Sequence, residues 1–169
     1  MLIRMKPAPK HSQLQLRVSK EEKAAIRRAA QRAGMDMSSY VLSRALPAPE
    51  TAFQEAVAAL NGPAPPSYAL AEVSSLLAEL AAPELRRAVA AAPAASLAPF
   101  LANYVAAMVE TACAARSIPV PAWTRTLPAL EEPVFGSTLQ SLRLYLLTHS
   151  PPAFRRRNIF VDSSVGHRV

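Results

Sequence analysis

The sequence predicts a mainly α protein, in which an N-terminal module of one strand and two helices intertwines with a second copy and an all-α helical domain follows. Three observations predict this class. Residues 13–18 alternate polar and apolar side chains, which is the period of a half-buried strand. The residues after them carry apolar side chains at helical spacing. The remainder of the 169 residues is rich in Ala, Leu and Pro, and the prolines divide it into short helical pieces.

The predicted strand is expected to pair with the same strand of a second chain. A single strand leaves its backbone N–H and C=O groups unpaired, and nothing else in the sequence offers it a partner. Antiparallel pairing across a two-fold axis places alternate side chains on opposite faces. The predicted dimer core consists of Leu14, Leu16, Val18, Ile26, Tyr40 and Val41. The opposite face carries Gln13, Gln15 and Arg17.

A capping box starts the first helix of the module. Ser19 and Glu22 have the S-x-x-E spacing in which each side chain accepts a backbone N–H of the other residue. This pattern predicts a helix over residues 20–33. Gly34 is expected to end it, because glycine adopts positive φ without a Cβ clash.

The exposed face of the paired strands is predicted to bind DNA. A two-stranded ribbon fits the major groove, where Gln and Arg form paired hydrogen bonds with adenine and guanine edges. Either Ser38 or Ser39 is expected to cap a second helix that runs to Leu46, and free N–H groups there can hold a phosphate. The predicted phosphate-binding residues are Lys10, Lys20, Ser38 and Ser39.

The distribution of charge agrees with this interpretation. The formal net charge is +7, and residues 1–46 hold ten Lys and Arg against three Asp and Glu. Residues 47–169 hold nine Arg against nine Asp and Glu, so the whole excess lies in the first quarter of the chain. A basic segment on a neutral body indicates a polyanion partner. The alternative is an ordinary solvated basic face.

Residues 12–46 resemble the ribbon-helix-helix family, especially its short repressor-antitoxins. The stretch "LQLRVSKEEKAAIRRAAQRAGMDMSSYVLSRAL" has the alternating strand, the S-x-E-E start, an Ala-rich helix, Gly, and a Ser-rich turn into a second helix. The resemblance implies that Gln13, Gln15 and Arg17 read bases and that Ser38 and Ser39 clamp a phosphate. Asp36 departs from the pattern, because many relatives carry Ser or Thr there. The alternative is a strand that only covers a helical core.

The rest of the chain is expected to be a linker and a helical domain that binds a partner. A flexible basic tail is predicted for 1–11, a linker with a short helix for 47–67, and the helical partner-binding domain for 68–169. Helices are expected near residues 50–61, 68–81, 84–92, 97–116, 138–149 and 152–158. The apolar 97–115 stretch contains Asn103 and Glu110, which favours a buried core helix over a membrane span.

The segment 142–162 has two interpretations. It holds Phe154, Arg155, Arg156, Arg157 and Phe160, which could bind a partner through apolar anchors and guanidinium groups. It could also be a structural strand or turn whose arginines pair with the domain's own acids. Segments from "PVPAW" to "FRRRNIFVD" also resemble, more weakly, antitoxin-like regulators that sit beside nucleotidyltransferase-type toxins.

No catalytic or metal-binding pattern is visible, so we expect no enzyme activity, no catalytic residue, no metal and no cofactor. The three histidines have no Cys, Asp or Glu at ligand spacing, and there is no Gly-rich phosphate loop. A single cysteine, Cys113, fits a reducing cytoplasm and an inert core thiol, and no signal peptide is apparent.

The leading hypothesis is a homodimeric, cytoplasmic antitoxin of a toxin–antitoxin pair. It would repress its own operon by binding a double-stranded DNA operator, and it would neutralise a cognate toxin through the residues after Pro47. One alternative is a ribbon-helix-helix transcription factor whose helical domain senses a small ligand. Another is a dimeric scaffold protein that does not bind DNA.

Overall fold

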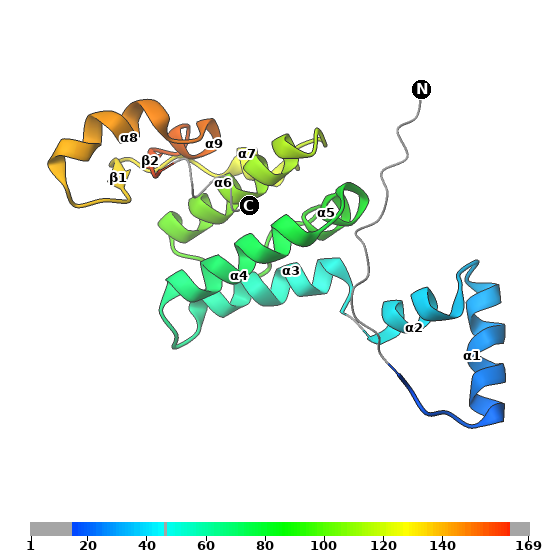
Figure 1. Ribbon diagram of the computed structural model, residues 1–169. Helices are drawn as coiled ribbons and strands as arrows, with labels where there is room; N and C mark the ends of the chain where they lie inside the picture. Colours follow the sequence, from blue (N-terminus) through cyan, green and yellow to red (C-terminus); the bar gives the residue numbers. More distant parts are fainter. Residues whose placement is uncertain (1–14, 46, 163–169) are drawn as a thin grey trace. The chain divides into compact units, whose positions relative to one another are not determined.

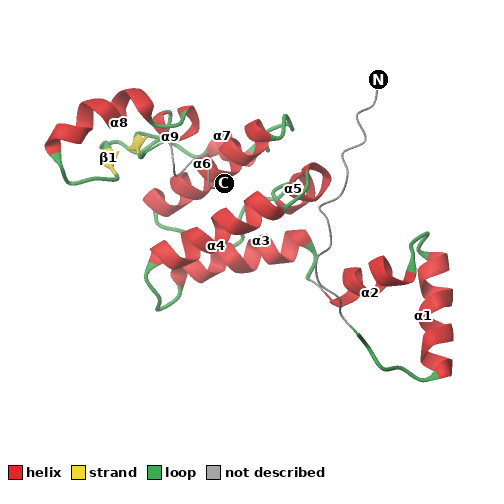
Figure 2. Cartoon of the chain, viewed as in Figure 1, coloured by secondary structure: helices red, strands yellow, loops and turns green. Residues whose placement is uncertain are grey.

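The structure, a computed structural model, describes residues 15–45 and 47–162. It divides into two compact units, residues 1–46 (the first unit) and residues 47–169 (the second unit), shown in Figure 1. The described part of the chain is mainly helical, as predicted from the sequence (Figure 2).

The first unit contains helices α1 (Lys20–Arg32) and α2 (Met37–Ala45). The predicted capping box is present at the start of α1. The Glu22 N–H donates to Ser19 Oγ at 3.1 Å, and the Ser19 N–H donates to Glu22 Oε2 at 2.7 Å. Gly34 has φ +66°, and its N–H and that of Met35 donate to carbonyls of the last turn of α1. Glycine is favoured there because a left-handed residue closes the helix end.

The predicted strand is not formed by the single chain. Residues 15–19 have no regular secondary structure, although Ser19 is extended. Gln13 and Leu14 lie outside the described residues. A strand is defined by hydrogen bonds to a neighbour, and residues 15–45, the described part of the first unit, offer the segment none.

Prolines start most helices of the second unit, because a missing N–H costs nothing in the first turn. Pro49, Pro66, Pro99 and Pro152 are the first residues of α3, α4, α6 and α9, and Pro83 follows the first residue of α5. The elements are α3 (Pro49–Ala58), η1 (Ala59–Asn61), α4 (Pro66–Glu79), α5 (Ala82–Ala88), α6 (Pro99–Ala115), α7 (Trp123–Thr126), β1 (Val134–Phe135), η2 (Gln140–Leu142), α8 (Arg143–His149), α9 (Pro152–Arg155) and β2 (Ile159–Phe160).

Helix α6 lies at the centre of the second unit, packed against α4, α5, α7 and α9. It is apolar on nearly all sides, as expected of a buried helix. The apolar side chains buried along it are Val105, Ala106, Ala107, Met108, Val109, Ala112 and Cys113. The core helix expected at 97–116 is therefore present.

Two expectations about the second unit need correction. The region 47–67 is not a linker, because α3 packs against α4 and α5 and buries Phe53 and Val57 completely. The domain is also not all-α. Val134 pairs with Ile159 and Phe135 with Phe160 in a short parallel sheet, and the two Phe rings stack with centroids 5.0 Å apart.

Candidate nucleic-acid interface and buried arginine cluster

The described base-reading candidates are exposed. Gln15 and Arg17 lie on the irregular segment before α1, and Lys20 begins that helix with its side chain in solvent. The other two predicted contacts on this side, Lys10 and Gln13, lie outside the described residues. Gln15, Arg17 and Lys20 are therefore accessible to a ligand that binds the first unit.

The predicted dimer core is left partly uncovered in one chain. Leu16 is 61% exposed and Val18 is 45% exposed, although both are large apolar side chains. Ile26, Tyr40 and Val41 are half-buried, and Leu14 lies outside the described residues. Ala30 is the single buried residue of the described part of the first unit. The described part of this unit consequently presents an apolar face that residues 15–45 do not cover themselves.

Asp36, and not a serine, caps α2. The Ser39 N–H donates to Asp36 Oδ1 at 3.0 Å, and the Ser39 hydroxyl donates to Asp36 Oδ2 at 2.6 Å. The N–H and hydroxyl of Ser39, which were expected to bind a phosphate, thus donate to the Asp36 carboxylate. The negative charge of that carboxylate would also repel a phosphate. Ser38 is exposed in the first turn of α2. The phosphate-binding assignment of Ser39 is therefore corrected to a capping partner.

The cations of the first unit face solvent. Within the described residues, none of the lysines and arginines of α1 and α2 forms an ion pair. Arg44 lies over the Tyr40 ring, 5.4 Å from its centroid. The positive charge of this unit is therefore not neutralised within the part of the chain that the structure describes.

The C-terminal segment has the opposite character. Phe154, Arg157 and Phe160 are buried, so their assignment to partner binding is corrected. Phe154 packs edge-on against the Tyr104 ring at 5.1 Å between centroids. Arg155 and Arg156 remain exposed. The segment is held inside the second unit by its own contacts, as the structural alternative expected.

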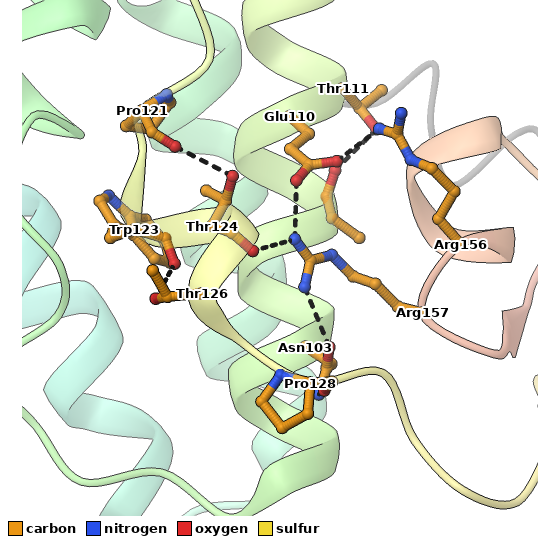
Figure 3. Close-up of polar contacts among 11 residues, drawn as sticks. Asn103, Glu110, Thr111, Pro121, Trp123, Thr124, Thr126, Pro128, Arg156 and Arg157 are labelled. Atoms are coloured by element: carbon orange, nitrogen blue, oxygen red, sulfur yellow. Dashed lines mark hydrogen bonds and ion pairs between the residues drawn. The ribbon is translucent and has the colours of Figure 1, made fainter.

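Glu110 of α6 receives two arginines, as Figure 3 shows. Arg157 Nη2 lies 2.7 Å from Glu110 Oε1, and Arg156 Nη2 lies 2.7 Å from Oε2. Arg157 also donates from Nη2 to the Thr124 carbonyl at 2.6 Å and from Nη1 to Asn103 Oδ1 at 3.0 Å. These five residues, called the arginine cluster below, join α6 and α7 to the turn before β2.

The arginines determine the charge of Glu110. The side chains of Glu110 and Arg157 are each 7% exposed, whereas that of Arg156 is 70% exposed. Burial by itself raises the pKa of Glu110. Hydrogen bonds and positive charge, chiefly from Arg157, outweigh that effect and hold the pKa below its ordinary value. Glu110 is therefore ionised at neutral pH, and the buried Arg157 has a charged partner.

Sequence reasoning did not identify the arginine cluster as a unit. The available signal was the pair Asn103 and Glu110, two polar residues seven positions apart in an otherwise apolar helix. Seven residues are two helical turns, so both side chains lie on one face. Asn103 is fixed there by donating from Nδ2 to the carbonyls of Pro99 and Pro128, each at 3.0 Å.

Among residues 15–45 and 47–162, no group of three or more His, Cys, Asp or Glu side chains could hold a metal ion. The Cys113 thiol is buried, and burial, with a smaller effect of Glu110, raises its pKa against the opposing charge of Arg116. A protonated, inaccessible thiol is a poor nucleophile. In the same ranges, no helix has both the length and the apolar character needed to cross a bilayer.

Residues 8–61 match the family model described as NikA-like, mobilization protein NikA. That family is a DNA-binding family of the ribbon-helix-helix type. The match covers less than half of the chain and extends beyond the predicted module through α3 and η1. No curated protein and no solved structure matches the chain. The similarity therefore concerns residues 8–61 alone, and it gives no evidence for pairing with a toxin.

Proposed function

We propose that the protein binds double-stranded DNA as a homodimer, with the 13–18 segments of two chains paired in the major groove. The match of residues 8–61 to a DNA-binding family of the ribbon-helix-helix type is the observation that carries this proposal. The same match has a mobilization protein as its description. We therefore propose that this chain binds DNA as part of DNA mobilization.

The exposed apolar face of the first unit supports the homodimer. Leu16 and Val18 follow the same alternation as Gln15 and Arg17, so pairing two segments buries the first pair and presents the second. Burial of a Leu or Val side chain stabilises by roughly 1.5–3 kcal/mol relative to exposure. Two such residues from each chain supply a substantial driving force for association.

Unneutralised positive charge supports the choice of DNA as the partner. The lysines and arginines of α1 and α2 form no ion pair in the described part of the first unit. Release of counterions from DNA phosphates then contributes to binding and makes it steeply dependent on salt. A scaffold protein that does not bind DNA would show no affinity for a duplex at any salt concentration.

Selection from a random duplex pool, followed by titration of the selected site, tests the proposal. Arg17→Ala is expected to cost about 1–3 kcal/mol per lost base contact and to relax the sequence preference. Lys20→Ala should weaken binding to all duplexes alike and reduce the salt slope by about one. The exposed Arg155, on α9 of the second unit, supplies the control Arg155→Ala, which should leave DNA affinity unchanged. Unchanged affinity and preference in Arg17→Ala would reject the paired segments as the reading element.

The antitoxin role stays a prediction and is a second candidate. Phe154, Arg157 and Phe160, three of the five candidates for partner binding, are buried, but another apolar surface supports a protein partner. Leu142, Leu144, Tyr145 and Leu147, in and beside α8, are exposed. Co-expression with the product of an adjoining gene tests this candidate. A complex that Leu144→Ser disrupts would support it, whereas a chain that purifies free of that product would count against it.

A further inference from the structure

A cavity of about 350 Å³ lies beside the arginine cluster. Its polar lining comes from three elements: Glu110 from α6, Thr124 and Arg125 from α7, and Arg156 and Arg157 from the turn after α9. The remaining lining residues are small or apolar. Small-molecule sites in proteins commonly begin near this volume and combine apolar walls with a few polar groups.

The charge of the cavity wall is positive. Three arginines, Arg125, Arg156 and Arg157, line the cavity together with a single acidic residue, Glu110. Both oxygens of that carboxylate already accept hydrogen bonds from arginines, as Figure 3 shows. The wall therefore has positive charge in excess, and it has no free carboxylate oxygen to repel an anion.

Several N–H donors of this wall are not used within the described residues. Arg156 donates from Nη2 alone, and Arg125 is exposed without an ion-pair partner in the same residues. Arg157 Nε also has no hydrogen-bond partner there, but it is buried behind the wall, where a ligand in the cavity does not reach it, and the other two nitrogens of that guanidinium donate to Asn103, Glu110 and Thr124. Guanidinium groups present N–H donors in a planar fork that matches carboxylate and phosphate oxygens.

We propose that this cavity binds a small molecule carrying a phosphate or carboxylate group. Arg125 and Arg156 contact the anionic oxygens, and the buried Glu110–Arg157 pair holds Arg156 in place. The volume exceeds that of a bare oxyanion, so the ligand carries a further small moiety against the apolar wall. This inference does not depend on the proposed DNA binding, because it concerns residues of the second unit alone.

Calorimetric titration of the full chain with inorganic phosphate, and separately with succinate, tests the proposal and distinguishes the two chemistries. Wild-type protein should bind at least one probe saturably. Arg125→Gln should weaken that binding about tenfold, or about 1.4 kcal/mol. Arg155→Gln removes the same charge from a neighbouring exposed position that does not line the cavity, and it should change binding less than twofold.

Thermal unfolding of the same three proteins gives a second measurement. The bound anion should raise the melting temperatures of wild type and of Arg155→Gln by the same amount, and that of Arg125→Gln by less. Without anion, all three should melt alike, because both substituted side chains are exposed. DNA affinity in phosphate-free buffer should also be the same in all three.

Three results would overturn the proposal. The first is the absence of saturable binding by either probe. The second is an equal loss of anion affinity in Arg125→Gln and Arg155→Gln, which would indicate nonspecific attraction of the anion to positive charge. The third is a loss of duplex affinity in Arg125→Gln together with displacement of phosphate by the duplex, which would assign the cavity to the DNA backbone. None of these results changes what is expected of Arg17→Ala, so the proposals of anion binding and of DNA binding can fail independently.

Discussion

The two units differ in how they use the same kinds of side chain. The second unit has an extensive core of its own, in which Phe53, Leu77 and Phe154 have no exposed surface, although some apolar side chains in and beside α8 stay exposed. The first unit leaves Leu16 and Val18 largely in solvent. Arginines differ in the same way, since Arg156 and Arg157 pair with Glu110 whereas those of α1 and α2 form no ion pair within the described residues.

This difference indicates which part of the chain is complete by itself. The second unit has a large apolar core and a buried ion pair of its own, as expected of a domain that folds alone. In the part that the structure describes, the first unit has exposed apolar side chains and almost no core, and its lysines and arginines form no ion pair. We infer that association completes the first unit, with a second chain covering the apolar face and DNA meeting the positive charge.

The largest expected effect comes from the core of the second unit. Phe53→Ala should lower the free energy of unfolding by about 3–5 kcal/mol, because the site is fully buried and a cavity remains. Urea unfolding should show the same loss at low and high protein concentration. Leu16→Ala, the matched change in the first unit, should lower stability in a way that depends on protein concentration, because it weakens association. If the stability lost in Leu16→Ala did not depend on protein concentration, the proposed difference between the two units would be wrong.

Glu110→Gln should have the next largest effect. It should destabilise the second unit by about 1–3 kcal/mol at neutral pH, because Arg157 loses its charged partner. The pKa of Glu110 is lower in the folded state, so its contribution is present above about pH 4.3 and is lost as the pH falls through the folded pKa. The difference in unfolding free energy between wild type and variant should therefore narrow on acidification.

Urea unfolding of both proteins at neutral and acidic pH checks this prediction. Glu132→Gln removes an exposed carboxylate from the same unit and should change stability by about 0.5 kcal/mol at most. If the difference in unfolding free energy between wild type and Glu110→Gln stayed constant across the acidic range, the ionised form of the Glu110 carboxylate would not be what stabilises the second unit.

The smallest predicted effect concerns the start of α1. Ser19→Ala removes the hydroxyl that accepts the Glu22 N–H and should cost about 1 kcal/mol. The loss should appear in the unfolding of the first unit and leave that of the second unchanged. Ser38→Ala, in the first turn of α2, serves as the control, since Asp36 caps that helix. Equal losses in the two variants would contradict the assignment of the caps.

Features set by local interactions were predictable from the sequence. The Ser19–Glu22 capping box joins residues three apart, and Gly34 ends α1 through bonds to its last turn. Helix starts in the second unit follow the prolines, whose fixed φ suits the first turn. In each case, the residues that determine the structure are adjacent or one turn apart.

Features set by distant contacts were not predictable. Arg157 and Glu110 are 47 positions apart, and the β1–β2 pairing joins residues whose local sequence has no strand alternation. The sequence therefore left open whether Arg156 and Arg157 face a partner or the domain's own acids. The cap of α2 is different, because it is a local contact that sequence reasoning assigned to Ser38 or Ser39, although Asp36 lies only three residues before Ser39.

The central claim is that two chains associate through their first units to build the DNA-reading surface. Sedimentation equilibrium of the full chain in low-salt buffer measures this directly, with Leu16→Asp as the matched variant. The account predicts twice the mass of one chain for the wild type and the mass of one chain for the variant, with the second unit still folded in both. A wild-type protein that sediments at the mass of one chain, alone and when bound to its selected duplex, would contradict the account.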